Sequence, residues 1–369
     1  MINILFLNHD AALGGAEVNL LKTLRTLDRS KFVINVWLGS QGLLEKEVNA
    51  IPQLKVHRSV SRRLKFNYNP IAVIRDLYSN VSCISRIVKQ ERIGILYANS
   101  FRSAIYAAII KCFQPHLKFV WHKRHSTAKN LAFTFIASNS DLVLTNSNSL
   151  RSELITYSVG SDKIKTIYNG IDFKLFEKYS IKESVRQPGV KQLVCIGKIV
   201  PAKGQLDFIK LIEKLNKERD CIGTIVGKVV DYEYYAVCKN YIKAKDLGAT
   251  INFVDETLQV YDIIAMADVL ISVSYKEAFG MAILESLACK TPVTAYDVGG
   301  VKEVVGETLS PLVLVPAGDI DAMSHIVIKL LSDSNYVTKV LFEADRYIKR
   351  FDISNCRAET EKCLENLFL

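Results

Sequence analysis

The stretch ADVLISVSYKEAFGMAILESLACKTPVTAYDVGG occupies residues 267–300 and decides how the second half of the chain folds. It begins with a short apolar run at 268–274, which predicts a buried strand. A polar loop follows, and residues 281–289 have the apolar spacing of a helix. A second apolar strand is predicted at 292–297. A strand, a helix and another strand, with continuously apolar strands, are typical of a parallel sheet covered by helices on both faces.

The same alternation runs through the whole chain in two series. In the first series the predicted strands are 2–7, 32–39, 93–99, 118–122 and 141–147, and helical patterns lie at 17–27, 82–89 and from about residue 103. The second series has strands at 192–197, 222–227, 251–255, 268–274 and 292–297, with helices at 206–216, 232–245 and 258–265. Two such series predict an α/β protein with two doubly wound, Rossmann-like domains facing a cleft, where ligands bind at the carboxyl ends of the strands.

The domain boundaries are placed where the alternation stops. We expect an N-terminal Rossmann-like domain at 1–170 and a second one at 192–350. The linker is expected at 171–191, which is polar and contains Pro188-Gly189. The end of the chain has a helical pattern without a strand, and we expect a C-terminal helix at 351–369 that packs back on the N-terminal domain. With 369 residues, 49% of them hydrophobic, the chain has enough material for two cores.

Cysteines and apolar runs indicate the compartment. The eight cysteines are scattered without a CxxC pair or zinc spacing, which fits buried free thiols in a reducing environment. The N-terminus, MINILFLNHD, is too short and too soon polar for a signal peptide. No apolar run reaches the ~18 residues that a membrane span needs. We therefore expect a cytoplasmic protein.

The positive charge is concentrated in the first half of the chain. Residues 1–170 carry 23 Lys and Arg against 10 Asp and Glu. Such a half fits an anionic membrane surface, a phosphate-bearing substrate or a surface bias that keeps the protein in solution. The interleaved aromatics of RRLKFNYNP (62–70), which follow Arg58, favour contact with a membrane interface. The sequence contains no nucleic-acid-binding motif, so we expect no nucleic-acid partner.

Two glycine-containing loops follow the first strand of each series. Gly14-Gly15-Ala16-Glu17 opens a predicted helix, where a glycine backbone lets a ligand come close and the helix N-terminus favours anions. The second loop, GKIVPAKG, covers 197–204 and holds Lys198 and Lys203, which could neutralise a diphosphate. A plain turn and two solvated lysines are the alternatives. Neither the GxGxxG fingerprint nor a Walker A pattern is present.

The loop and helix of the opening stretch carry two carboxylates. Glu277 lies in the loop, and Glu285 lies about one and a half turns into the helix, within the apolar run AILESLA. The first amides of that helix, at Gly280, Met281 and Ala282, are expected to face the cleft. Each glutamate could bind hydroxyl groups on a different part of one ligand. Taken alone, each could equally belong to a solvated helix face.

Together these motifs resemble the retaining glycosyltransferases of family four, which have the GT-B fold. The resemblance rests on Glu277-x7-Glu285 with Phe279-Gly280 and on the following Gly299-Gly300. It extends to GGAE at 14–17, DLVLTNSNSLRSEL at 141–154, KIKTIYNGID at 163–172 and GKIVPAKG at 197–204. It covers nearly the whole chain and is strongest from 163 to 304.

The resemblance implies roles for particular residues. Lys203 would contact the donor diphosphate, and Lys198 would assist it where the family more often has Arg. Glu277 would bind the donor sugar near the reacting face, and Glu285 the ribose hydroxyls. The remaining donor-binding residues implied, through the backbone for the most part, are Gly14, Gly15, Gly227, Val254, Phe279, Gly280, Met281 and Ala282. A histidine after an N-terminal-domain strand would lie by the donor sugar, and His122 and His125 are both candidates, with His9 a weaker one.

The implied activity is transfer of a hexose or N-acetylhexosamine, with retention, from a nucleotide-diphosphate sugar to a saccharide or lipid-linked saccharide. We expect no cofactor and no metal, a UDP-sugar rather than a GDP-sugar as donor, and a role in bacterial surface polysaccharide synthesis, such as that of lipopolysaccharide. The protein would work in the cytoplasm, at the inner face of the cytoplasmic membrane. The alternatives are a sugar-nucleotide epimerase of the same fold, a non-catalytic sugar-nucleotide-binding subunit and a dinucleotide-dependent oxidoreductase.

Overall fold

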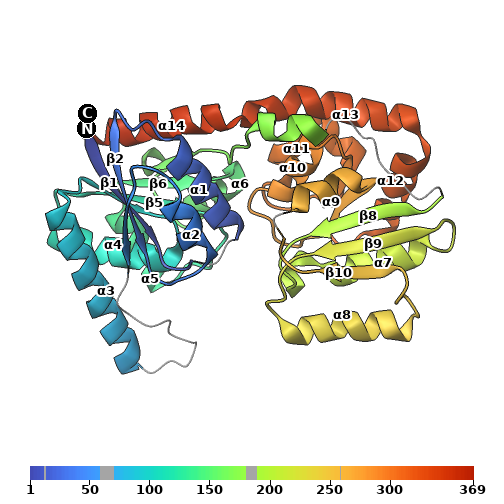
Figure 1. Cartoon of the computed structure of the whole chain (residues 1–369), viewed down its shortest axis with the longest axis horizontal. Coiled ribbons are helices and arrows are strands. Elements are labelled where there is room, and N and C mark those ends of the chain that lie inside the picture. Colours follow the sequence, from blue (N-terminus) through green and yellow to red (C-terminus); the bar gives the residue numbers. More distant parts are fainter. Residues whose placement is uncertain (12–13, 59–69, 180–188, 258) are drawn as a thin grey trace. The chain divides into compact units, whose positions relative to one another are not determined.

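The computed structural model describes residues 1–11, 14–58, 70–179, 189–257 and 259–369. The chain divides into two compact units, shown in Figure 1. The first unit contains Met1–Gly170 and Ile353–Leu369, and the second contains Ile171–Asp352. Each unit is a parallel sheet with helices on both faces, so the predicted α/β class and the two Rossmann-like sheets are confirmed.

The sheet of the first unit has seven parallel strands in the order β3-β2-β1-β4-β5-β6-β7. The strands are β1 (Ile2–Asn8), β2 (Phe32–Leu38), β3 (Lys55–Arg58), β4 (Ile95–Ala98), β5 (Lys118–Lys123), β6 (Leu142–Thr145) and β7 (Ile164–Thr166). The order reverses direction between β1 and β4, which is the switch point of a doubly wound sheet. The strands β1, β2, β4, β5 and β6 match the predicted ones. The edge strands β3 and β7 were not predicted, because they are short and partly exposed.

Helices cover both faces of this sheet and form two separate cores. One core includes residues of α3 (Pro70–Gln90), α4 (Phe101–Phe113), α5 (Leu131–Asn139) and α6 (Asn148–Thr156). The other includes residues of α1 (Gly15–Thr26), α2 (Leu43–Asn49) and α14 (Ile353–Glu365). Helix α3 begins at Pro70, much earlier than the predicted 82–89. The reason is that its first turns expose the apolar side chains Ile71 and Ile74, which hides the amphipathic pattern.

The sheet of the second unit has six parallel strands in the order β10-β9-β8-β11-β12-β13. They are β8 (Lys191–Ile196), β9 (Cys221–Val226), β10 (Ile251–Val254), β11 (Val269–Ser272), β12 (Val293–Tyr296) and β13 (Leu314–Val315). Its helices are α7 (Gln205–Leu215), α8 (Tyr232–Ala244), α9 (Val260–Met266), α10 (Met281–Ala288), α11 (Val301–Val313), α12 (Ile320–Ser332) and α13 (Ser334–Ile348). Five of the six strands match predicted ones; β13 has only two residues.

The segment expected as a linker, 171–191, begins within the second unit. Ile171 forms a parallel bridge with Asp352, and Phe176 in η2 (Phe173–Tyr179) is buried. Residues 180–188 of that segment lie outside the described residues. The chain therefore enters and leaves the second unit at adjacent positions, since Ile171 and Asp352 are paired.

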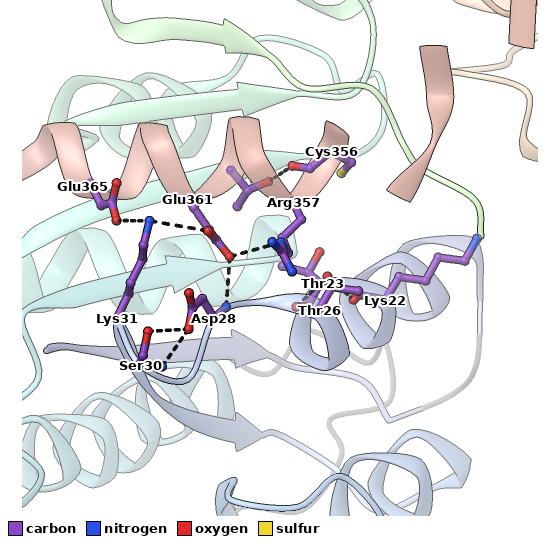
Figure 2. Close-up of polar contacts among 11 residues, drawn as sticks. Lys22, Thr23, Thr26, Asp28, Ser30, Lys31, Cys356, Arg357, Glu361 and Glu365 are labelled. Atoms are coloured by element: carbon purple, nitrogen blue, oxygen red, sulfur yellow. Dashed lines mark hydrogen bonds and ion pairs between the residues drawn. The ribbon is translucent and has the colours of Figure 1, made fainter. Parts of the chain in front are cut away.

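The last helix, α14, packs against α1 in the first unit. Figure 2 shows polar contacts between α14 and residues 28–31, which follow α1. Glu361 is buried, and its Oε1 accepts a hydrogen bond of 2.9 Å from the Asp28 amide. Lys31 forms an ion pair of 2.8 Å with Glu365, and Leu364 is fully buried in the core. These contacts hold α14, a mostly polar helix near the C-terminus, against the unit whose sheet is formed by residues 2–166.

None of the helices in the described ranges combines the length and the apolar character needed to span a bilayer.

We predict that Leu364→Ala destabilises the first unit by about 2–5 kcal/mol, because it removes a fully buried side chain and leaves a cavity. Leu369→Ala is the matched control, since Leu369 is fully exposed at the end of the same segment. Urea unfolding of the full chain measures both. Equal stability of the two variants would contradict the packing of α14 described above.

Candidate functional site

The loop after β11 places polar groups at the carboxyl edge of the second sheet. It runs from Val273 to Gly280, where α10 begins. Gly280 has a φ of +105°, a left-handed conformation that a residue with a side chain adopts at a cost. The turn that Gly280 makes starts α10 at this edge, where the first amides of a helix have no partner within the helix. These amides can bind an anion.

The loop 197–204 lies directly against the loop after β11. Gly204 has a φ of +68°, and a Cβ on it would lie 2.0 Å from the Val273 carbonyl oxygen. The Tyr275 amide donates to the Ala202 carbonyl at 2.9 Å. A glycine at this position lets the two loops, which follow the neighbouring strands β8 and β11, come into backbone contact.

This contact brings Lys203 and Glu277 together. Lys203 Nζ lies 2.5 Å from Glu277 Oε2, with the side chains 27% and 19% exposed. Both charged groups are therefore partly shielded from water but remain accessible at the carboxyl edge of the sheet. An ammonium group there can stabilise a phosphate group that develops negative charge, and a carboxylate beside it can bind sugar hydroxyls.

A second pair of glycines supports Glu277 from the opposite side. A Cβ on Gly299, whose φ is +55°, would lie 1.9 Å from the Glu277 carbonyl oxygen. The Gly300 amide donates to the same oxygen at 3.1 Å. The Gly299-Gly300 turn therefore holds the backbone of Glu277 in position before α11.

Asp207 anchors the loop after β11 and was not found by sequence reasoning. Its Oδ2 accepts hydrogen bonds from the hydroxyls of Tyr275, at 2.5 Å, and Tyr296, at 3.0 Å. The hydrogen bond to Asp207, together with burial, raises the pKa of Tyr275 to about 12. Asp207 lies in the first turn of α7, directly after the loop that carries Lys203. It therefore connects the two loops a second time.

Glu285 has a partner that was also missed. The hydroxyl of Tyr261, on α9, donates to Glu285 Oε1 at 3.2 Å, and the Tyr261 ring packs on Phe176 with centroids 4.9 Å apart. Burial and the neighbouring carboxylate raise the pKa of Tyr261, so its hydroxyl stays protonated. Glu285 is thereby held in a fixed position on α10.

Three of the predicted donor-binding residues between the two glutamates differ in accessibility. Phe279 is 1% exposed, and its ring packs edge-on against Phe351 at 5.5 Å between centroids. Its side chain is therefore part of the core, and only its backbone can face a ligand. Met281 and Ala282, in the first turn of α10, are partly exposed.

The carboxyl ends of β8, β9 and β10 bring the other predicted residues to the same edge. The Gly227 amide donates to the Val254 carbonyl at 2.9 Å, and a Cβ on Gly227 would lie 2.2 Å from the Gly197 carbonyl oxygen. Lys198, which follows Gly197, is exposed. The predicted residues of the second unit thus line one edge of one sheet.

The predicted residues of the first unit occupy different surroundings. The Gly14 amide donates to Glu17 Oε2 at 3.1 Å, and Gly15 is exposed, with open space around its Cα. His9, the weaker of the histidine candidates, has Nδ1 2.8 Å from Ser100 Oγ. Both features lie at the carboxyl end of β1.

The two histidines after β5 have opposite environments. His122 is 5% exposed, and its Nδ1 lies 2.5 Å from the Tyr97 hydroxyl. Burial and the nearby Arg124 guanidinium hold the pKa of His122 well below its usual value, so it is neutral. His125 is exposed, and its carbonyl accepts from Lys123 Nζ at 2.7 Å. Of the two, His125 is the one that a ligand can reach in this conformation.

Within the described residues, His, Cys, Asp and Glu side chains do not gather in groups of three or more that could hold a metal ion.

Comparison with known families gives two matches. The model of the glycosyl transferases group 1 matches residues 177–345, and the model of glycosyltransferase family 4 matches residues 13–175. The two matches together cover both units.

Two curated relatives illustrate the similarity. The chain is 27% identical over 210 residues to the N-acetyl-alpha-D-glucosaminyl L-malate synthase of Bacillus anthracis, which covers 55% of this chain and 54% of that protein. It is 27% identical over 151 residues to the 2-deoxystreptamine N-acetyl-D-glucosaminyltransferase of Streptomyces fradiae, covering 40% and 36%. The chain thus aligns with about half, or less, of the length of these relatives.

Among solved structures, the Anabaena protein HepE in complex with UDP and glucose has the same fold. Its TM-score is 0.84 at 19% identity, covering 99% of this chain and 100% of that one.

We predict that Gly299→Ala lowers the stability of the second unit by about 1–3 kcal/mol, because the added Cβ meets the Glu277 carbonyl at a positive φ. Gly248→Ala is the control, since Gly248 has open space around it and no positive φ. Thermal unfolding measures the stability, and hydrogen exchange of residues 273–280 reports the loop. An unchanged exchange rate in Gly299→Ala would contradict the support of Glu277 by this turn.

Proposed function

Because the chain belongs to the group 1 glycosyltransferases of family 4, we propose that it transfers a sugar from a nucleoside diphosphate sugar to an acceptor, with retention of configuration. The observation that carries the proposal is the contact of Lys203 with Glu277 at the carboxyl edge of the second sheet. An ammonium for the leaving diphosphate and a carboxylate for the sugar are there held side by side by the backbone.

The chemistry follows from how the charges are arranged. The bond between the sugar and the diphosphate breaks heterolytically, so negative charge develops on the phosphate and positive charge on the sugar ring. Lys203, assisted by the exposed Lys198, would stabilise the phosphate without a metal ion. Glu277 would then exchange its contact with Lys203 for the sugar hydroxyls. No cofactor is required by this scheme.

The rest of the nucleotide would extend along the same edge. Glu285, fixed by Tyr261, would accept hydrogen bonds from the ribose hydroxyls, and the amides of Gly280, Met281 and Ala282 would bind the phosphates. The base would lie near Gly227 and Val254. Gly14, Gly15 and the backbone of Phe279 would complete the donor site, as the family resemblance implies. The accessible His125 and the buried His122 are the candidates for a histidine beside the sugar.

The comparisons support a choice of donor. Two relatives are named as N-acetylglucosaminyl-transferring enzymes, and HepE was solved with UDP. We therefore propose a UDP-linked N-acetylhexosamine or hexose. The acceptor would be a saccharide or lipid-linked saccharide of bacterial surface polysaccharide synthesis, on the cytoplasmic side of the membrane.

We predict that Lys203→Ala and Glu277→Gln each lower kcat by about 100-fold or more, the effect of removing one group that stabilises transition-state charge. The assay measures UDP released from UDP-N-acetylglucosamine or UDP-glucose with a saccharide acceptor. Lys214→Ala is the control, because Lys214 pairs with the exposed Asp321 on the same unit. Near wild-type turnover in either site variant would refute the assignment.

The same assay on the wild-type protein separates the alternative functions. Interconversion of donor sugars without acceptor would indicate an epimerase, and UDP binding without turnover would indicate a binding subunit.

The membrane part of the proposal rests on one face of α3. Ile71, Ile74 and Tyr78, each at least 66% exposed, lie on successive turns of this helix. Arg75, Arg86 and Lys89 are exposed on it too. The helix contains one carboxylate, Asp76, which is buried and forms an ion pair of 2.7 Å with Arg102.

In Figure 1 the first turns of α3 project beyond the strands of the first unit. An apolar stripe beside unopposed cations fits an anionic lipid surface. The basic residues Arg62, Arg63 and Lys65, also expected at the membrane, lie outside the described residues.

We predict that Arg75→Gln weakens binding to vesicles containing phosphatidylglycerol about fivefold at low salt, the effect of about 1 kcal/mol per cation at an anionic surface. Tyr78→Ser should weaken it as well, by removing apolar contact. Lys217→Gln, an exposed cation of the second unit, is the control. Co-sedimentation measures the binding. If wild-type protein binds anionic and neutral vesicles equally, membrane docking through α3 is wrong.

A further inference from the structure

The first unit contains a small cavity between α1 and α14. It has room of about 20 Å³, enough for one water-sized particle. Its lining includes Asn19 and Thr23 from α1, Cys356 from α14, and His122 and Arg124 from the end of β5. Figure 2 shows four of the lining residues, Lys22 and Thr23 on α1 and Cys356 and Arg357 on α14.

Arg124 brings a buried positive charge to this cavity. The residue is 6% exposed, and its Nε and Nη1 donate to the amide oxygens of Asn99 and Asn169, each at 3.0 Å. Both acceptors are neutral. The third nitrogen, Nη2, is buried and has no hydrogen-bond partner within the described residues. Burial lowers the pKa of Arg124, and the negative charge of Glu17 offsets this effect only in part.

His122 supplies a second buried donor. Its ring is neutral, because burial depresses its pKa, and Tyr97 keeps its proton, because burial raises the pKa of the phenol. His122 Nδ1 is the one acceptor found for the Tyr97 hydroxyl within the described residues, so we assign the O–H as the donor in this contact of 2.5 Å. The imidazole proton is then on Nε2, which is buried and also has no partner in the described part of the chain.

Two buried N–H groups without an acceptor therefore belong to residues that line the same cavity, and one of these residues is a cation. More positive charge lies around it. Lys22 lines the cavity and donates to the Gly170 carbonyl at 3.2 Å, and the exposed Arg357 lines it from α14. Glu361 is a buried carboxylate on α14. Its Oε1 already accepts a hydrogen bond from the Asp28 amide and lies 3.5 Å from Arg357 Nε.

We propose that this cavity binds one chloride-sized anion, between Arg124 Nη2 and His122 Nε2, as the counter-ion of Arg124. A water molecule would fill the space and satisfy the donors, but it would add no negative charge to balance the buried guanidinium. A monatomic anion is the smallest group that could bring negative charge into a space of about 20 Å³, which is too small for a phosphate or carboxylate group. The anion would stabilise the packing of α1 on α14. It would also fix Asn169, the residue before Gly170, where the first segment of this unit ends.

The direct test is a crystal structure of the unmodified protein grown or soaked in sodium bromide. Bromide replaces chloride and scatters anomalously. We expect an anomalous difference peak within hydrogen-bond distance of Arg124 Nη2 and His122 Nε2. Density there without an anomalous signal would identify a water molecule and overturn the proposal.

A solution test uses the whole chain at constant ionic strength, with sodium chloride replacing sodium gluconate, whose anion is too large for the cavity. We expect the Tm of the wild type to rise with chloride and to saturate. Arg124→Gln should lose this dependence, and Arg86→Gln, an exposed arginine of the same unit, should keep it. If Arg124→Gln does not fold, His122→Phe, which removes one donor, should weaken chloride binding about tenfold. A wild-type Tm that is the same in both salts would refute the site.

Discussion

The backbone contact between the loops after β8 and β11 is the constraint on which the candidate site depends. Gly204 lies so close to the Val273 carbonyl that a Cβ would be 2.0 Å from it, and the Tyr275 amide bonds to Ala202. Only because the backbones meet can Lys203, from one loop, reach Glu277, from the other, at 2.5 Å. The ion pair is a consequence of this approach and not its cause, since a partly exposed pair contributes little to stability by itself.

The same edge is reinforced from three further directions. Gly299-Gly300 supports Glu277 from the side of β12, Asp207 holds Tyr275 and Tyr296, and Phe279 inserts its ring beside Phe351. Each of these fixes the backbone or an anchoring side chain and leaves the charged groups at the open edge. The site is therefore held by the sheet, so its geometry does not depend on a flexible loop finding one conformation.

The sequence was enough to predict this edge but not its internal supports. Continuous apolar runs predicted β8, β9, β11 and β12, and a parallel sheet aligns their carboxyl ends, so Lys203, Glu277 and Glu285 could be placed together. Asp207 could not be found, because an aspartate in the first turn of a helix is explained by the helix dipole alone. Its partners, Tyr275 and Tyr296, are 68 and 89 residues away. The family resemblance placed Phe279 in the donor site. Its side chain, however, is buried against Phe351, which lies 72 positions later in the sequence.

Supporting residues and ligand-facing side chains are thus different residues. This difference explains why the segment 267–300 identifies a family more readily than a substrate. The residues that fix the geometry are glycines and buried anchors, whose role is the same whatever sugar or base is bound. The region assigned to the base, at Gly227 and Val254, is joined by a backbone hydrogen bond and offers few side chains. Backbone amides and carbonyls are common to every residue type, so they leave little trace in the sequence. Selection of base, sugar and acceptor must then come from the few side chains that are partly exposed at the edge, and these can vary without disturbing the supports beneath them.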